Sequence, residues 1–230
     1  NTQLVKDVPE LARMYKDKSV AEQNSIDLAW ALLMEDKFKN LRSSIYSTAA
    51  ELRRFRQLVV NTVLATDIMD KELKALRNAK WEKAFSQDAP NLHNSLNSNL
   101  MEINNRKATV VIEHLIQASD IAHTMQHWQV YRKWNQRLFR EMYRAYCEGH
   151  SDKDPSDGWY EGEIGFFDFY IIPLAKKLDE CGVFGVSSHE YLNYAEQNRK
   201  EWEKKGKNVV REYIKETQLE YAFAERERGG

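Results

Sequence analysis

Glycine and proline are scarce in this chain, which has nine glycines and four prolines among 230 residues. These two residues mark most turns between short strands, so a β-sandwich or barrel of this length would need many more of them. The long stretches between them carry apolar residues three or four positions apart, the spacing of a helix buried along one face. The sequence therefore predicts an all-α fold, in a length that fits one compact domain with an extension.

The expected helices follow from this spacing and from capping signals. Ser19-Val20-Ala21-Glu22 reads as a capping box, and Ser187-Ser188-His189-Glu190 reads as a second one. An aromatic helix carries a stripe formed by Tyr131, Trp134, Leu138, Met142 and Tyr146. The remaining expectations are a helix over 49–76, a loop over 86–105, a helix over 107–122, a loop over 150–157, a helix over 159–181 interrupted near Pro173, and a helix from 187 that ends near Gly206.

Composition excludes several classes of protein. The chain is 42% hydrophobic and 30% charged with a net charge of −1, and it shows no basic patch or stripe of the kind that binds nucleic acid. Its most apolar stretch, 166–175, is too short to cross a bilayer, so we expect no membrane contact from this segment. Two cysteines form neither a disulfide framework nor a metal-binding spacing, which favours the reducing cytoplasm.

Asp120 is the acid that looks most out of place. It ends an apolar helix, and no lysine or arginine occurs between residues 108 and 131. A buried carboxylate there would need a partner, a metal or a raised pKa, whereas a carboxylate at the helix end could simply face water. Asp120, His123 and His127 would share one face of a continuous helix and could bind a metal. A new aromatic helix is expected to begin at Trp128, which indicates a helix break before it. The evidence for a metal site on one helix face is therefore weak.

Other candidates have plain structural explanations when they are taken singly. Thr66 lies in an apolar stripe, where a threonine commonly bonds back to its own helix. Glu22 is explained as the acid of the capping box. Aromatic stripes are more often core than ligand-binding surface.

Taken in order, five segments carry a resemblance. They are residues 15–24 (YKDKSVAEQN), 63–68 (VLATDI), 114–121 (HLIQASDI) with Trp134 and Arg137 downstream, 162–169 (GEIGFFDF) with Pro173-Leu174, and 196–202 (EQNRKEW). Together they resemble the catalytic domain of class I cyclic-nucleotide phosphodiesterases. The resemblance covers residues 1–205, and residues 206–230 are expected to form a charged helical tail.

The resemblance implies an activity and its cofactors. Members of this family hydrolyse the cyclic phosphate of cAMP or cGMP to the 5′-monophosphate with a zinc and a magnesium (or manganese), which activate a bridging water. Asp120 falls on one of the family's zinc ligands. Glu22 and Thr66 fall on positions that hold metal-bound waters.

The resemblance also implies a nucleotide pocket. Phe166 and Ile164 match an apolar clamp around the purine, and Trp134 helps to build the pocket. Ile121 and His123 follow the zinc aspartate and are expected to contact substrate. His123 stands where the family usually has an asparagine.

Glu163 is the most informative departure, because the family has a glutamine there whose amide bonds the purine edge. An ionised carboxylate only accepts hydrogen bonds, whereas an amide both donates and accepts. Guanine offers two neighbouring donors, while adenine offers one donor beside an acceptor. We therefore expect Glu163 to favour cGMP, unless a raised pKa keeps the acid protonated. Asn24 and Lys71 also stand where histidines are common.

The family's other metal ligands come from H-N-x-x-H and H-D segments, which would precede Asn1. Asp120 alone cannot hold a zinc, which takes three or four protein ligands. We expect a fragment that is inactive by itself, cut from a larger soluble or membrane-attached protein. A degenerate phosphodiesterase that binds a nucleotide or a partner without hydrolysis is the alternative. The ordered motifs argue against a purely structural helical domain, and the oligomeric state, monomer or homodimer, stays open.

Overall fold

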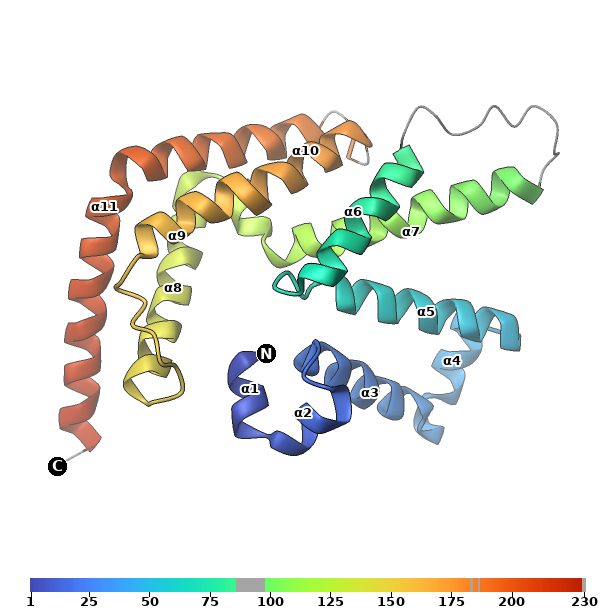
Figure 1. The fold of residues 1–230 in the computed structure, drawn as a ribbon, viewed down its shortest axis with the longest axis horizontal. Coiled ribbons are helices and arrows are strands. Elements are labelled where there is room, and N and C mark those ends of the chain that lie inside the picture. Colours follow the sequence, from blue (N-terminus) through green and yellow to red (C-terminus); the bar gives the residue numbers. More distant parts are fainter. Residues whose placement is uncertain (86–97, 183, 186, 229–230) are drawn as a thin grey trace. The chain divides into compact units, whose positions relative to one another are not determined.

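The computed structural model describes residues 1–85, 98–182, 184–185 and 187–228. Within these residues the regular secondary structure is entirely helical, which confirms the predicted all-α class (Figure 1). The chain divides into two compact units, Asn1–Asp120 and Ile121–Gly230. The expected division at residue 205 stays a prediction, although Gly206 lies inside a helix.

The first unit is built around three helix contacts. Its long helix α7 packs against α5 and α6, and α3 packs against α5. Its elements are α1 (Thr2–Asp7), α2 (Pro9–Tyr15), α3 (Val20–Met34), the 3₁₀-helix η1 (Asp36–Phe38), α4 (Lys39–Ile45), α5 (Ala49–Ala65), α6 (Lys71–Phe85) and α7 (Ser98–Asp120).

The second unit is organised by its last helix, α11, which contacts α8, α9 and α10. Its elements are the 3₁₀-helix η2 (Ala122–Met125), α8 (Trp128–Cys147), α9 (Trp159–Phe166), the π-helix η3 (Phe167–Ile171), α10 (Ile172–Glu180) and α11 (Ser187–Arg228). The core is aromatic, with fully buried rings at Tyr131, Phe139, Phe167, Trp202 and Tyr213. Tyr131 meets Phe167 and Trp202 edge to face, a favoured arrangement of aromatic rings.

The first predicted capping box is wrong. Ser19 precedes α3 in a left-handed conformation (φ 40°) and makes no side-chain cap. Its hydroxyl instead donates to Asp67 Oδ2 at 2.8 Å, a partner distant in sequence. A true capping box opens α5, where Thr48 accepts from the Glu51 amide and Glu51 accepts from the Thr48 amide.

The single helix expected over 49–76 is two helices, α5 and α6. The break lies at two aspartates whose side chains take up backbone N–H groups. Asp67 Oδ1 accepts from the amides of Met69 and Asp70, and Asp70 Oδ1 accepts from those of Glu72 and Leu73. Such local bonds compete with a continuous helix and start a new one.

Other helix boundaries also differ from the expectations. Helix α7 begins at Ser98, well before residue 107, and part of the expected loop (86–97) lies outside the described residues. The interruption expected near Pro173 is present as the π-helix just before it, because proline offers no N–H to the preceding turn. Helix α11 begins at Ser187 as expected but continues past Gly206 to Arg228.

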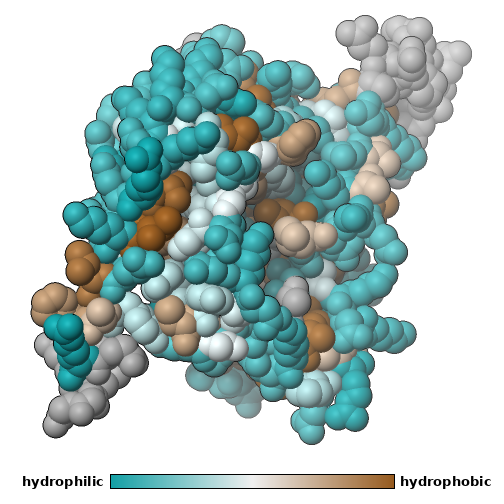
Figure 2. Space-filling model, turned by 60° about the vertical axis from the view of Figure 1, so that its left-hand side comes forward, coloured by the Kyte–Doolittle hydropathy of each residue, from teal (hydrophilic) through white to brown (hydrophobic). Residues whose placement is uncertain are grey.

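The aromatic stripe of α8 is largely on the surface. Trp134 and Leu138 are 49% and 44% exposed, and Met142 and Tyr146 are exposed as well. The buried face is instead Tyr131, Asn135 and Phe139. On the face drawn in Figure 2, polar side chains predominate and apolar ones form separate patches. In the described part of the chain, no helix combines the length and apolarity needed to span a membrane.

Candidate functional site

Glu22 lies at the first turn of α3, where a network of polar bonds holds it. Asn1 donates through Nδ2 to Glu22 Oε2 at 2.9 Å and to Asp67 Oδ2 at 3.3 Å. The side-chain oxygen of Asn1 also accepts from the Ala21 amide at 2.8 Å. Together with the Ser19–Asp67 bond, these contacts tie the start of α3 to the turn between α5 and α6. Glu22 is therefore held close to the segment that follows Thr66.

Thr66 ends α5, and its hydroxyl donates to the carbonyl of Val63 at 2.7 Å. This bond to its own helix is the plain structural role expected for a threonine there, and it leaves the oxygen lone pairs available. The neighbouring carbonyl of Ala65 accepts from Gln117 Nε2 at 2.9 Å. Gln117 lies one turn before Asp120 on α7, so this bond connects the ends of α5 and α7.

Asp120 is the last residue of α7 and is exposed, with a pKa raised by partial burial of its carboxyl. The helix stops there, as the restart at Trp128 had indicated. His123 follows in η2, and His127 caps α8 by accepting from the Gln129 amide at 3.3 Å. The arrangement of Asp120, His123 and His127 on one helix face is therefore absent.

The candidate metal-binding side chains of this region do not form a metal site by themselves. Asp120, Glu22 and Thr66 belong to three helices joined by the Asn1, Ser19 and Gln117 contacts. Among the described residues, however, no three His, Cys, Asp or Glu side chains are grouped as metal ligands. Since a structural or catalytic zinc takes at least three protein ligands, the residues present do not fit a bound zinc.

Glu163, in the second unit, lies on α9 at the centre of a hydrogen-bonded cluster. Its side chain is half-buried, and its carboxyl accepts from the hydroxyl of the fully buried Tyr131 at 2.7 Å. The indole N–H of Trp159 donates to Asn135 Oδ1 at 3.1 Å, and Asn135 lies on the same buried face of α8 as Tyr131. Burial raises the pKa of Glu163, while the bonds from Tyr131 and Asn135 oppose that rise.

The sequence did not identify these residues as neighbours of Glu163. The cluster consists of two pairs of residues spaced four apart, Tyr131 with Asn135 on α8 and Trp159 with Glu163 on α9. This spacing places each pair on one helix face, which is a signal present in the sequence. Which two faces meet depends on the packing of α8 and α9, so the spacing alone could not identify the cluster.

His123 lies beside the same cluster. Its ring is parallel to that of Tyr131, with centroids 6.4 Å apart, and its centroid lies 6.3 Å from that of Trp134. Burial lowers the pKa of His123, which favours the neutral imidazole near neutral pH. The backbone of η2 is held by Asn198, whose amide donates to the carbonyls of Thr124 and Gln126 at 2.9 and 2.7 Å.

The apolar candidates lie partly open to solvent. Phe166 and Ile164 on α9 are half-buried, and Phe166 stacks on Tyr170 with ring centroids 5.3 Å apart. Trp134 is half-exposed, and the Arg137 guanidinium lies 4.9 Å from the centre of its ring. Ile121 is half-buried at the start of η2, where its carbonyl accepts from the amide and hydroxyl of Thr124.

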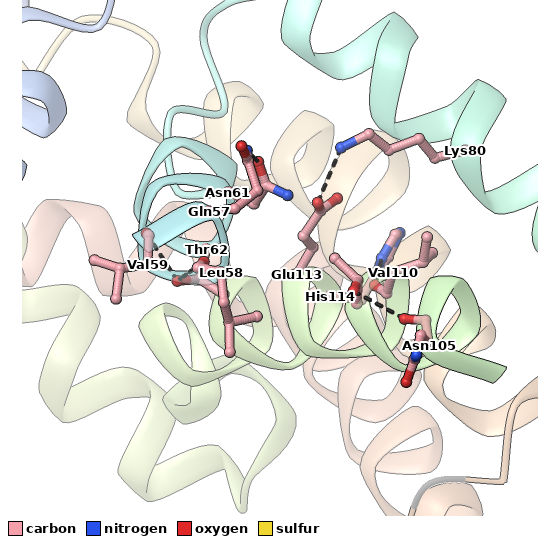
Figure 3. A network of polar contacts seen from close by, with 11 residues as sticks. Gln57, Leu58, Val59, Asn61, Thr62, Lys80, Asn105, Val110, Glu113 and His114 are labelled. Atoms are coloured by element: carbon pink, nitrogen blue, oxygen red, sulfur yellow. Dashed lines mark hydrogen bonds and ion pairs between the residues drawn. The ribbon is translucent and has the colours of Figure 1, made fainter. Parts of the chain in front are cut away.

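A separate polar cluster joins α6 and α7 in the first unit (Figure 3). Glu113 is only 1% exposed, and its Oε1 pairs with Lys80 Nζ at 3.0 Å. Its Oε2 is buried without a hydrogen-bond partner among the described residues. The neighbouring His114 ring lies 2.8 Å, at Nδ1, from the carbonyl oxygen of Val110. This cluster contains one carboxylate and one ammonium and holds two helices together.

Comparisons with known proteins match this chain to one enzyme family. A family model described as 3′5′-cyclic nucleotide phosphodiesterase matches residues 1–190. A Caenorhabditis elegans protein described as a probable 3′,5′-cyclic-AMP phosphodiesterase (pde-4) is 27% identical over 213 residues, which are 88% of this chain and 29% of that protein. The mouse dual specificity calcium/calmodulin-dependent 3′,5′-cyclic nucleotide phosphodiesterase 1B is 25% identical over 186 residues, covering 74% of this chain and 30% of its own length.

A solved structure shares the fold. The phosphodiesterase domain of Salpingoeca rosetta rhodopsin phosphodiesterase superimposes with a TM-score of 0.64 at 22% identity, and the match covers 95% of this chain and 63% of that domain. This chain therefore spans less than a third of the curated relatives and under two thirds of the solved domain.

Proposed function

This chain belongs to the 3′5′-cyclic nucleotide phosphodiesterase family, and we propose that it forms part of a domain that hydrolyses cAMP or cGMP to the 5′-monophosphate. The family match over residues 1–190 is the observation that carries this proposal. The proposed compartment is the cytoplasm, in keeping with two free cysteines, Cys147 and Cys181.

Asp120 is the proposed contribution of this chain to the metal pair of the family, a zinc with a magnesium or manganese. Glu22 and Thr66 are its proposed partners, as acceptors for metal-bound water. The tie between α3 and the α5–α6 turn, and the Gln117 bond from α7 to α5, support a joint role for these three residues. Because the described residues lack further grouped ligands, residues 1–230 alone should not hydrolyse the nucleotide.

The proposed base pocket lies in the second unit. His123 and Trp134 are neighbours in space, and Phe166 and Ile164 share α9 with Glu163. Half-buried aromatic and aliphatic side chains of this kind, together with one polar group, suit a flat purine ring. Ile121 completes the proposed set through its place at the start of η2.

Glu163 is the proposed selector of the base. The Tyr131 hydroxyl donates a hydrogen bond to its carboxyl, which suits a group that accepts. A carboxylate would accept from the two neighbouring donors of guanine and would repel the acceptor of adenine. A pair of charge-assisted bonds is worth about 1–3 kcal/mol, so the preference for cGMP should be roughly five- to 150-fold.

Hydrolysis is tested by comparing residues 1–230 with the full-length protein that contains them. Cleavage of cAMP and cGMP is measured with zinc and magnesium present. The full-length protein should be active, and Asp120→Ala should abolish its activity, while residues 1–230 should show none. Glu163→Gln should lower the ratio of kcat/KM for cGMP over cAMP.

A non-catalytic module that binds a nucleotide or a partner is the second candidate. The lack of grouped metal ligands in the described residues and the glutamate at position 163 favour it. It predicts a full-length protein that binds cyclic nucleotide but turns over neither one, even with both metals present. That result would overturn the enzyme proposal.

A further inference from the structure

Helix α11 uses its acidic side chains to hold α8, which lies beside it (Figure 1). Between residues 207 and 224 it has three glutamates, and each pairs with an arginine of α8. Glu212 pairs with Arg132, while Glu216 and Glu220 pair with Arg140 at 3.3 and 3.0 Å. The negative charges of this stretch are therefore neutralised within the second unit.

The cations of the same stretch are exposed and lack such partners. Lys207, Arg211 and Lys215 are spaced four residues apart, so they are neighbours along one face of the helix. Within the described part of the chain, none of the three pairs with a carboxylate. Lys207 Nζ lies 5.3 Å from the centre of the Tyr160 ring, and Arg211 donates to Asn208 Oδ1 of its own helix at 2.8 Å.

The sequence conceals this imbalance of charge. Arg211 and Lys215 are each followed directly by a glutamate, so positive and negative charges alternate and no basic stripe is evident. Because Arg132 and Arg140 of α8 neutralise those glutamates, the positive charges remain on the surface without acids to balance them. Only the packing of α8 against α11 separates the two signs.

The row of cations continues into exposed apolar side chains. Leu219 and Phe223 follow Lys215 at the same spacing of four residues, and they are 54% and 66% exposed. A shallow hollow of about 360 Å³ is lined by Leu219 together with Arg211 and Lys215. We call Lys207, Arg211, Lys215, Leu219 and Phe223 the outer row of α11. Cations beside exposed leucine and phenylalanine are typical of a helix that lies at the surface of a membrane.

Charge and hydrophobicity together distinguish between the possible partners of the outer row. Two copies of the row would repel each other through their cations. The phosphate backbone of a nucleic acid would neutralise the cations but would offer no apolar surface to Leu219 and Phe223. An anionic bilayer offers both, because its headgroups are negative and its acyl chains accept apolar side chains.

We propose that the outer row of α11 docks on an anionic lipid surface. Lys207, Arg211 and Lys215 contact the headgroups, and Leu219 and Phe223 enter the boundary with the acyl chains. Such a helix lies in the plane of the membrane, so it needs no spanning segment, and none occurs in the described residues. The outer row lies beyond residue 190, where the family match ends, so the proposal does not depend on the proposed hydrolysis.

The first test measures co-sedimentation of the 230-residue chain with lipid vesicles. Vesicles of phosphatidylcholine with about 30% phosphatidylserine should bind the chain, and vesicles of phosphatidylcholine alone should bind it at least tenfold more weakly. Binding should weaken steeply as NaCl rises from about 0.05 to 0.3 M, because salt screens the cations. Equal binding to the two kinds of vesicle, or binding to neither, would overturn the proposal.

The second test removes the cations of the outer row. Each cation near an anionic surface contributes roughly fivefold to binding, so Lys207→Gln, Arg211→Gln and Lys215→Gln combined should weaken it about 100-fold. Phe223→Ala should weaken binding roughly tenfold. The matched control removes the same charge from three exposed positions of α8 and α10 and should weaken binding less than about fivefold; its residues, each replaced by glutamine, are Lys133, Arg144 and Lys176.

Circular dichroism establishes that each variant keeps its helix content. Should the triple variant unfold, Phe223→Ala and the comparison of the two kinds of vesicle still decide the matter. If the triple variant binds as the wild type does, or if the control loses as much, the contact lies elsewhere and the proposal fails. If the wild type leaves the vesicles unbound but retards a labelled DNA duplex in a gel, the partner is a nucleic acid and the lipid proposal is wrong.

Discussion

Replacing Gly206 with alanine should destabilise the protein, although glycine is normally the poorer helix residue. Gly206 is buried within α11, where a Cβ atom would lie 2.8 Å from Tyr160 Cδ2 and 3.0 Å from two ring carbons of Trp202. Trp202 is fully buried, and its indole donates to the Tyr160 carbonyl. Neither ring can therefore move aside without disturbing other contacts.

The expected magnitude is the difference between two opposing effects. Overfilling a packed site costs about 1–3 kcal/mol. Alanine in place of glycine within a helix recovers about 1 kcal/mol. The net loss in the free energy of unfolding should therefore be about 1 kcal/mol. A smaller loss would require the Tyr160 ring to shift cheaply.

Gly162→Ala is the matched control, because Gly162 lies in α9 with no atom within 4 Å of an added Cβ. It should stabilise the protein by up to about 1 kcal/mol through helix propensity alone. Both variants are compared by urea unfolding followed by circular dichroism. The close contact at Gly206 is disproved if Gly206→Ala proves as stable as Gly162→Ala.

Three further predictions concern stability. Thr48→Ala removes the capping box of α5 and should cost about 1 kcal/mol in urea unfolding, and no loss would argue against that cap. Phe139→Ala should cost about 3–5 kcal/mol in the free energy of unfolding because the ring is fully buried. Leu138→Ala, at an exposed position, should change stability by less than about 0.5 kcal/mol. Equal losses would contradict the assigned buried face of α8. Burial raises the pKa of Glu163 in the folded protein, so its carboxyl binds a proton more tightly there than in the unfolded chain and stability falls as pH rises above about 4.5. Glu163→Gln should therefore gain stability relative to the wild type as pH rises from 4 to 7 in thermal melts, and a constant difference would show that the carboxyl titrates normally.

The class of fold and the family could both be read from the sequence. Scarce glycine and proline together with helical spacing predicted the all-α class, which is confirmed. The ordered motifs predicted the cyclic-nucleotide phosphodiesterase family, which the family match over residues 1–190 confirms. Both patterns involve residues close together in the sequence, so they can be recognised without knowing how the helices pack. The roles assigned to Asp120, Glu22, Thr66 and the base-pocket residues stay predictions.

Helix caps and buried helix faces were less predictable, because residues distant in the sequence decide them. Ser19 resembles a helix cap by its spacing to Glu22, but Asp67 takes its hydroxyl. The helical stripe of α8 identified a helix, but not which side of it is buried. Leu138 and Phe139 are neighbours in the sequence, and the packing of α11 and α9 decides that only Phe139 is in the core.

The sequence by itself determined that the chain is helical, which family it belongs to, and that Glu163 replaces an amide expected to contact the base. Only the tertiary structure showed that the Tyr131 hydroxyl donates to this carboxyl and that α11 continues through Gly206. The physical reason is the range of the interactions involved. Helix propensity acts within about one turn of the chain, whereas the charge of a buried carboxyl depends on groups that meet it from another helix.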